Sequence, residues 1–176
     1  MRYLLIVIMI SVVALLGCTQ QEIEVTDEQQ EVTEQAAETT EQAGEASSYQ
    51  PGTWITDYNQ ALQHARKLER PVLVNFTGSD WCIWCKRLSG EVFEKEAFLK
   101  FAGDNFVLLK VDFPQKTKLP QEVQKANQAL AEKYGIQGFP TIVLIDDKGE
   151  EITRTGYQEG GAEGYVKHLK ELLGMK

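Results

Sequence analysis

Residues 71–88 read PVLVNFTGSDWCIWCKRL and hold the clearest signals of the fold. Residues 71–77 form a short apolar run that starts with a proline, a pattern that predicts a buried strand. Residues 78–80 (Gly-Ser-Asp) predict a turn, and residues 81–88 have helical spacing. The two cysteines of this stretch would therefore lie one turn apart on the same helix face, with Cys82 at the helix N-terminus.

This placement predicts different roles for the two thiols. Unpaired backbone N–H groups and the positive end of the helix dipole favour a thiolate at Cys82, so we expect its pKa to be lowered. Asp80 opposes that shift, because it brings a negative charge close by in the sequence. Cys85 lies deeper in the helix, and we expect it to be shielded and to act as the resolving thiol. An exposed Cys82 is then the predicted nucleophile.

The chain has three cysteines, of which only Cys82 and Cys85 form a C-x-x-C pair. A structural zinc site needs four ligands, and only His64 and His168 are available to complete one, both far away in the sequence. We therefore expect no metal site of that kind. A Cu(I) carrier, which needs only two thiolates, stays open as an alternative. A structural disulfide also stays open, although so short a loop adds little stability. Redox chemistry is the interpretation that we favour.

Length and charge limit the remaining possibilities. The 176 residues are enough for one ordinary domain and a tail. The formal net charge is −8, which argues against a nucleic-acid partner because nucleic-acid binding needs a basic surface. Nine acidic residues and no Lys or Arg fall within residues 18–48, whereas residues 49–176 hold 17 charges of each sign. The predicted domain is therefore neutral, and the net acidity belongs to the segment before it.

Residues 1–17 have the features of a secretory signal peptide. Arg2 precedes an apolar run over residues 3–16, which as a helix would rise about 21 Å, less than the roughly 30 Å of a bilayer core. The sequence Leu-Leu-Gly-Cys at residues 15–18 resembles a bacterial lipobox. That resemblance implies cleavage directly before Cys18 and a lipid on its thiol. An uncleaved anchor with an incidental cysteine is the alternative.

Residues 18–48 predict a disordered acidic linker. This segment contains no aromatic residue and only three large aliphatic ones, so it cannot bury enough apolar surface to offset the entropy lost on ordering the chain. As a coil it would span roughly 30 Å on average. We expect it to hold the domain of residues 49–176 clear of a membrane surface.

The rest of the domain alternates helical and strand patterns. An amphipathic helix over residues 56–70 starts with Thr56 or Asp57 as its cap and is ended by Pro71. Further along, the sequence predicts helices at 94–102, 121–134 and 162–173, strands at 106–112, 141–145 and 150–155, and a hairpin turn at 147–149. This order predicts an α/β fold with a central mixed sheet, helices on both of its faces and a terminal hairpin. His64 and His168 are expected on solvated helix surfaces.

Three segments of this domain resemble the thioredoxin superfamily. They are LVNFTGSDWCIWCKRL at 73–88, FVLLKVD at 106–112 and YGIQGFPTIVLIDDKG at 134–149. The W-C-x-x-C motif and the Gly-Phe-Pro-Thr segment lie about 55 residues apart, which is a thioredoxin-like spacing. The resemblance covers residues 49–176. Within the superfamily, this segment is similar to exported, lipoprotein-type thioredoxin-like proteins of bacteria and to the C-terminal domain of periplasmic disulfide-interchange reductases.

The resemblance implies a substrate-binding surface around the dithiol. In the family, a proline at the position of Pro140 is cis and lies against the dithiol. The backbone of the residue before it, here Phe139, pairs with an extended substrate chain like an added strand. Trp81 and Trp84 would form an apolar collar around the dithiol. Trp54, which lies outside the motif, is expected to be a core aromatic residue.

The sequence departs from thioredoxin at three points. Ile83 and Trp84 stand between the cysteines in place of Gly and Pro, and one extra residue separates the strand from the motif. Asn75 stands where the family commonly has a buried aspartate. Because an amide cannot take the proton of the resolving thiol, water or Lys86 would have to do so. We expect Asn75 itself to be a structural hydrogen-bonding residue.

Together these features predict a lipid-anchored thiol–disulfide oxidoreductase of the bacterial cell envelope, facing the periplasm or the cell exterior. We expect it to reduce disulfides of protein substrates, because no histidine lies beside Cys82 to favour an oxidant. An oxidase or isomerase, and a Cu(I)-binding or adaptor protein, are the alternatives. No G-x-G-x-x-G fingerprint follows a strand, so we expect no bound cofactor. Electrons would come from the dithiol of another membrane protein, and the domain would act as a monomer.

Overall fold

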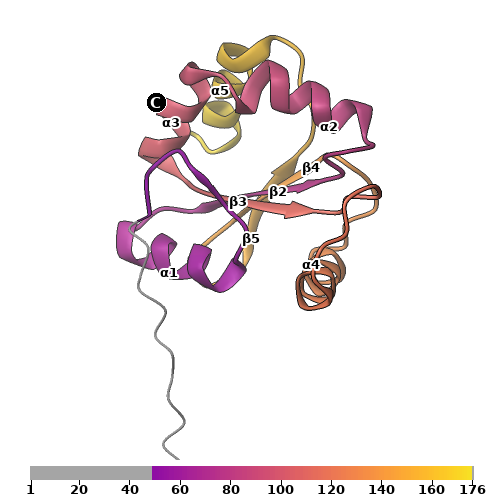
Figure 1. Ribbon diagram of the computed structural model, residues 1–176. Helices are drawn as coiled ribbons and strands as arrows, with labels where there is room; N and C mark the ends of the chain where they lie inside the picture. The colour runs from indigo at the N-terminus through magenta and orange to yellow at the C-terminus, as the bar shows by residue number, and fades with distance from the viewer. Residues whose placement is uncertain (1–48, 176) are drawn as a thin grey trace, which may run out of the picture. The chain divides into compact units, whose positions relative to one another are not determined.

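The structure is a computed structural model that describes residues 49–175 (Figure 1). The predicted signal peptide 1–17, the lipid on Cys18 and the linker 18–48 lie outside the described residues and stay predictions. Within residues 49–175, none of the helices has the length and apolar character needed to span a bilayer.

A five-stranded mixed sheet forms the centre of the domain, as the sequence predicted. Its strands are β1 (Trp54–Ile55), β2 (Val72–Thr77), β3 (Val107–Asp112), β4 (Thr141–Ile145) and β5 (Glu151–Thr155), in the spatial order β1-β3-β2-β4-β5. β1, β3 and β2 run parallel, whereas β4 is antiparallel to β2 and β5 is antiparallel to β4. β2 has partners on both sides, and all six of its residues are buried. The two-residue β1 was not predicted, because so short a strand has no periodic pattern.

Helices cover both faces of this sheet (Figure 1). They are α1 (Tyr58–Leu68), α2 (Ile83–Leu88), α3 (Glu96–Asn105), α4 (Gln121–Lys133) and α5 (Gly161–Leu172), and a π-helical turn, η1 (Ser89–Phe93), continues α2. α1 and α4 lie on one face, and α2, α3 and α5 lie on the other. The helical segment after the cysteines is longer than predicted, because η1 extends it to Phe93. The side chains of Val92 and Phe93 in this extension are buried in the core.

The alternation of side chains along β2 divides the core in two. Val72, Val74 and Phe76 pack with α1 in one cluster, whereas Leu73 packs in the cluster under α2, α3 and α5. Fully burying one such side chain contributes about 1.5–3 kcal/mol. The end of β2, from which the C-x-x-C segment leaves, is therefore held by packing on both faces of the sheet.

The ends of the helices follow sequence signals. Asp57 caps α1, because its carboxylate accepts a hydrogen bond from the Gln60 N–H at 2.7 Å. Gly135 follows α4 with a positive φ of 60°, which a residue with a side chain rarely adopts. Trp54, expected to be a core aromatic residue, is only partly buried, and it packs against the buried Phe93 with 5.1 Å between the ring centroids.

Both histidines are half-buried and not solvated as expected. His168 is half-buried, and its Nε2 lies 2.8 Å from the Thr155 hydroxyl of β5, so it does not simply face solvent. The reason is that this side of α5 packs against the end of the edge strand. His64 lies on α1, where its ring stacks on Tyr49 with 4.9 Å between the centroids.

Candidate active site

Cys82 and Cys85 are joined by a disulfide, with 5.2 Å between their Cα atoms. Cys82 is the N-cap of α2: its backbone is extended, and its Sγ accepts a hydrogen bond from the Cys85 N–H at 3.1 Å. Gly78 O accepts hydrogen bonds from the N–H groups of Trp81 (3.3 Å) and Cys82 (2.9 Å), which closes the turn after β2. The helix start predicted at Cys82 is confirmed.

The disulfide is enclosed by protein. Only 6% of Cys82 and 4% of Cys85 are exposed, so the expectation of an exposed Cys82 beside a shielded Cys85 is wrong for the oxidised pair. The reason is local, because Cys82 Sγ turns inward to its partner sulfur and to the Cys85 N–H, while the Gly78 N–H approaches Cys85 Sγ at 3.5 Å. A reacting molecule must pass between the residues that surround the pair, and these residues therefore shape the site.

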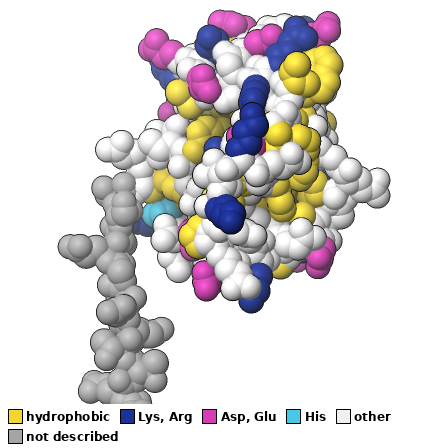
Figure 2. Space-filling view, turned by 45° about the vertical axis from the view of Figure 1, so that its right-hand side comes forward, with side chains coloured by type: hydrophobic (Ala, Val, Ile, Leu, Met, Phe, Trp, Pro, Cys, Tyr) yellow, Lys and Arg dark blue, Asp and Glu magenta, His cyan; other side chains and the backbone are white. Residues whose placement is uncertain are grey.

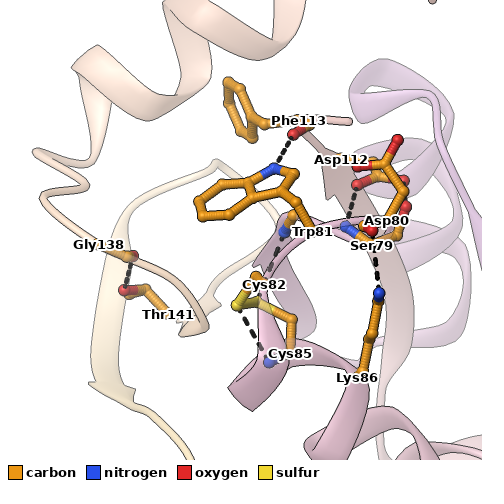
Figure 3. The surroundings of a disulfide bond; sticks show 11 residues. Ser79, Asp80, Trp81, Cys82, Cys85, Lys86, Asp112, Phe113, Gly138 and Thr141 are labelled. Atoms are coloured by element: carbon orange, nitrogen blue, oxygen red, sulfur yellow. Dashed lines mark hydrogen bonds between the residues drawn. A yellow bond between two sulfur atoms is a disulfide. The ribbon is translucent and has the colours of Figure 1, made fainter. Parts of the chain in front are cut away.

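The peptide bond between Phe139 and Pro140 is cis, as the resemblance implied. Pro140 directly precedes β4, whose Thr141 pairs with Phe76 near the end of β2. The cis segment therefore lies at the same end of the sheet as the disulfide, and Figure 3 shows its neighbours Gly138 and Thr141 on the loop across from the cysteines. Thr141 Oγ1 donates a hydrogen bond to Gly138 O at 2.8 Å, which closes this loop.

Trp81 lies on one side of the disulfide and is held by three contacts (Figure 3). Its Nε1–H donates a hydrogen bond to Phe113 O at 2.8 Å, and its ring meets Phe139 edge to face, with 5.9 Å between the centroids. The indole also lies directly on Gly78, where an added Cβ would come within 2.5–2.7 Å of ring atoms. Residue 78 therefore has to be glycine for the indole to approach this closely.

Trp84 is held by other side chains. Its ring packs against Tyr157 at 5.2 Å between the centroids, and the Arg87 guanidinium lies over both rings, at 5.4 and 5.2 Å. Glu91 accepts hydrogen bonds from the Tyr157 hydroxyl at 2.6 Å and from Arg87 Nε at 2.7 Å, and these bonds lower the pKa of Glu91. Half of Trp84 and 75% of Ile83 are exposed, so apolar surface adjoins the disulfide here.

The space-filling view gives the wider setting of the site. Figure 2 turns forward the side of the molecule that lies to the right in Figure 1, toward which β3 points. Hydrophobic side chains gather in a patch on this side, next to a row of Lys and Arg side chains. In this view the Lys and Arg side chains run between apolar areas, so apolar and positively charged groups adjoin each other on this side of the molecule.

Asp80 directs its carboxylate to the loop between β3 and α4 (Figure 3). The carboxylate accepts three backbone hydrogen bonds there, from the N–H groups of Gln115 (2.9 Å), Lys116 (2.7 Å) and Thr117 (3.1 Å). These bonds, that of Gln115 first, lower the pKa of Asp80. The sequence suggested that this charge would act on the neighbouring thiolate, but the loop amides are its direct partners.

Two further contacts attach the turn before the cysteines to the rest of the molecule (Figure 3). Asp112, at the end of β3, accepts hydrogen bonds from the Ser79 N–H at 3.0 Å and from Ser79 Oγ at 2.6 Å. Lys86 Nζ donates to the backbone O of Asp80 at 2.9 Å, so the amine considered for proton transfer is bonded to a carbonyl. The bonds of both carboxylates could not be predicted from the sequence, because their partners lie 33–37 residues away.

Asn75 is buried in β2 with 8% of its surface exposed, and its Oδ1 accepts no hydrogen bond within the described part of the chain. The expectation that Asn75 is a structural hydrogen-bonding residue is therefore wrong for this oxygen. Asn75 faces the same side of the sheet as Leu73, toward the core cluster under α2. An amide cannot accept a proton, so Asn75 does not act as a general base for either cysteine.

A groove of about 850 Å³ lies between α4 and the loop at residues 113–120. Phe113, Lys118 and Asn127 are among its lining residues, and neither cysteine is. Asn127 Nδ2 donates to Asp112 O at 2.8 Å, which ties α4 to the end of β3. The groove therefore adjoins the loop that supports Trp81 and is separate from the sulfur atoms.

Comparison with known proteins assigns the family, since a model described as thioredoxin-like domain matches residues 58–172. The chain belongs to the thioredoxin-like family. It is 38% identical over 119 residues to the disulfide bond reductase DsbH of Chlamydia pneumoniae, a match that covers 68% of this chain and 72% of that protein. It is 34% identical over 103 residues to the thioredoxin-related protein DsbJ of the same organism, of which it spans only 30%.

Solved structures agree with this assignment. The structure of a DsbH oxidoreductase matches with a TM-score of 0.67 at 37% identity, covering 70% of this chain and 85% of that one. A putative disulphide-isomerase from Bacteroides thetaiotaomicron matches with a TM-score of 0.53 at 26% identity, covering 70% and 93%. The predicted fold and family are confirmed. The predicted class is confirmed as well: this thioredoxin-like protein is a thiol–disulfide oxidoreductase.

Proposed function

We propose that this protein reduces disulfides of other proteins through the dithiol of Cys82 and Cys85. The observation that carries the proposal is the position of the pair at the N-cap of α2, across from the cis bond at Pro140. The similarity to a disulfide bond reductase supports the reducing direction. The residues between the cysteines support it too, because they are Ile83 and Trp84 and include no histidine.

In the proposed reaction the reduced pair supplies two electrons. The Cys82 thiolate attacks one sulfur of the substrate disulfide, which forms a mixed disulfide and releases the other sulfur as a thiolate that takes up a proton. Cys85 then loses its proton and attacks Cys82 Sγ. This step closes the Cys82–Cys85 disulfide and releases the second substrate sulfur, which is protonated in turn. The substrate gains two electrons and two protons.

The backbone around the pair favours Cys82 as the attacking thiol. Its Sγ accepts the Cys85 N–H even in the disulfide form, and a thiolate at that position would gain more from the same bond, because charged acceptors bind N–H groups more strongly. Cys85 lies one turn further into the helix and is placed to attack Cys82 Sγ. Since the amide of Asn75 cannot accept the Cys85 proton, we assign that proton to water.

The substrate in this proposal is an extended polypeptide. The backbone at Phe139, next to Pro140, would pair with it like an added strand. Trp81 and Trp84 would contact the substrate residues on either side of its cysteine, because their rings flank the disulfide and are partly exposed. Each aromatic contact adds apolar area around a reaction centre that is itself almost fully enclosed.

Insulin reduction tests the proposal. With dithiothreitol as the electron source, the wild-type protein should accelerate the precipitation of the insulin B chain, and Cys82→Ser should fall to the rate of dithiothreitol alone. Cys85→Ser should instead accumulate a mixed disulfide with the substrate. The potential of the pair should be near that of thioredoxin, about −270 mV, and a value near −120 mV would make the protein an oxidant. Activity that survives in Cys82→Ser contradicts the proposal.

We further propose that the mature chain starts at Cys18 and is held to a membrane of the bacterial envelope by a lipid on that residue. The lipobox-like sequence at residues 15–18 supports this, and residues 18–48 would serve as the spacer. The electron donor would then be the dithiol of another membrane protein, and the domain would act as a monomer. Mass spectrometry should find a lipid-modified Cys18 at the N-terminus, whereas an intact Met1 contradicts the proposal.

A further inference from the structure

Residues 115–117 of the 113–120 loop between β3 and α4 are tied to the C-x-x-C segment by one carboxylate, whereas the Phe113 N–H at the start of the loop donates to Thr77 O of β2 at 2.8 Å. Asp80 Oδ1 accepts the Gln115 N–H at 2.9 Å, and Oδ2 accepts the N–H groups of Lys116 at 2.7 Å and Thr117 at 3.1 Å. Residues 115–118 are exposed, so no hydrophobic packing holds this stretch in place. The side chain of Asp80 therefore determines where this part of the loop lies relative to the cysteines.

The same loop supplies the groups that position Trp81. Phe113 O accepts the Trp81 Nε1–H at 2.8 Å, and the Phe113 ring packs on Phe139 with 5.1 Å between the centroids. The Trp81 ring meets Phe139 from its edge. These three aromatic residues form one continuous wall beside the disulfide, which we call the aromatic wall (Trp81, Phe113 and Phe139). Two of its members belong to loops far away in the sequence.

A carboxylate is suited to this task in a way that a neutral side chain is not. Two oxygens with four lone-pair sites can accept three N–H groups at once, whereas an amide offers a single oxygen. Hydrogen bonds to an ionised acceptor are also roughly twice as strong as neutral ones. Asp112 reinforces the start of the loop from inside, through Ser79, but its bonds reach only the turn and not residues 115–117.

We infer that Asp80 is a positioning residue for disulfide exchange with polypeptides: it fixes the 113–120 loop, so that Phe113 holds Trp81 against Phe139 as one wall of the substrate site. This inference rests on the proposed function. Asp80 acts through the loop and not on the sulfur atoms. Its loss should therefore weaken the binding of a long substrate and leave the reaction with a small disulfide unchanged.

The experiment compares Asp80→Ala with Asp80→Asn and with Asp104→Ala, which removes an exposed carboxylate from α3. Three measurements are made on the full chain: KM and kcat for insulin, the rate with the small disulfide 5,5′-dithiobis(2-nitrobenzoate), and hydrogen exchange at Trp81 Nε1–H by NMR. Asp80→Ala should raise KM for insulin about tenfold, with kcat and the small-disulfide rate within about twofold of wild type. Its Trp81 Nε1–H should exchange at least about tenfold faster.

The asparagine variant and the control sharpen this result. Asp80→Asn keeps one acceptor oxygen, so its KM and exchange rate should fall between those of wild type and Asp80→Ala. Asp104→Ala should match wild type in all three measurements. Equal losses on insulin and on the small disulfide would mean that Asp80 acts through its charge on the thiolate, and the inference would be wrong. An unchanged exchange rate in Asp80→Ala would also overturn it.

The two proposals fail in distinguishable ways. If the wild-type domain reduces neither insulin nor the small disulfide, the proposed function is wrong. If the wild type is active but Asp80→Ala matches Asp104→Ala in KM and in exchange, the proposed function stands and the positioning role is wrong. Urea unfolding of both variants shows whether any loss of activity comes from unfolded protein, since a change in midpoint reports lost stability.

Discussion

Trp81 and Trp84 flank the same disulfide, three residues apart, yet they are held in opposite ways. Trp81 donates its indole N–H to a backbone oxygen, lies on Gly78 and meets Phe139, so its partners come from three separate segments. Trp84 packs with two side chains, those of the half-buried Tyr157 and the exposed Arg87. Their exposed fractions are similar, 40% and 50%, and exposure alone would not distinguish them.

One site can therefore have a rigid side and an adaptable side. A backbone oxygen and a glycine surface cannot change rotamer, so Trp81 has one available position. Arg87 and its partner Glu91 are both partly exposed, and such surface contacts are weak and easily rearranged. We expect Trp81 to act as a fixed wall for any substrate and Trp84 to adjust to each one.

The largest expected effect comes from filling the space under the Trp81 ring. Gly78→Ala places a Cβ within 2.5–2.7 Å of ring atoms, so the indole must leave Phe113 and Phe139. We expect the free energy of unfolding to fall by about 2 kcal/mol, measured by urea denaturation. Gly90→Ala is the matched control, because its Cβ would meet nothing within 4 Å. Equal stability of the two variants would show that Trp81 is not fixed by this contact.

Exchanging each tryptophan for phenylalanine compares the two sides directly. Trp81→Phe removes the bond to Phe113 O and should raise KM for insulin about fivefold. Trp84→Phe keeps an aromatic ring next to Arg87 and should raise it no more than about twofold. Steady-state kinetics with insulin measure both values. A larger effect at Trp84 would reverse the assignment of fixed and adaptable sides.

The fold and the cysteine pair could be predicted because their signals are local. The apolar run that forms β2, the turn at residues 78–80 and the helical spacing around the cysteines each lie within a few neighbours. The cis bond at Pro140 was implied by a family motif and is present. Local order in the sequence is thus sufficient for the elements other than β1 and η1, and the family motif adds the end of the sheet at which the site lies.

The contacts that shape the site could not be predicted, because they depend on long-range geometry. Nothing near Asp80 indicates that its carboxylate meets amides 35–37 residues later. The burial of Cys82 was also missed, since a helix N-terminus suggests exposure and the surrounding loops decide otherwise. The unpaired oxygen of Asn75 likewise appears only when β2 is packed under α2.

At acid pH we expect the contacts around Trp84 to weaken, because Glu91 becomes protonated. Hydrogen bonds from Tyr157 and Arg87 lower the pKa of Glu91 below its ordinary value of 4.5. Folding thus favours the ionised form of Glu91. Its contribution to the free energy of unfolding is present above pH 4.5 and is lost as pH falls through the lowered pKa. NMR shifts of the Trp84 and Tyr157 rings should titrate in that acid range. Glu91→Gln should abolish this titration, and its persistence would assign it to another group.

The smallest expected effect is the loss of one surface hydroxyl. Tyr157→Phe removes the hydrogen bond to Glu91 but leaves the ring against Trp84. We expect KM for insulin to change by less than about twofold, because the ring that contacts Trp84 stays in place and a partly exposed Glu91 can bond to water instead. Stopped-flow or steady-state reduction of insulin measures the change. A loss as large as that of Trp81→Phe would mean that the Trp84 side is as rigid as the other.

The described chain begins at the opposite end of the sheet from the cysteine pair. Tyr49 accepts the Leu108 N–H with its hydroxyl and stacks on His64, at the start of β3. Cys82 follows the opposite end of the parallel strand β2, so the two points are separated by roughly 16 Å along the strands. With the membrane attachment that we propose at Cys18, the chain would enter the domain at one end of the sheet, and the disulfide lies at the other end. The sulfur atoms are therefore distant from the residue at which the described chain begins.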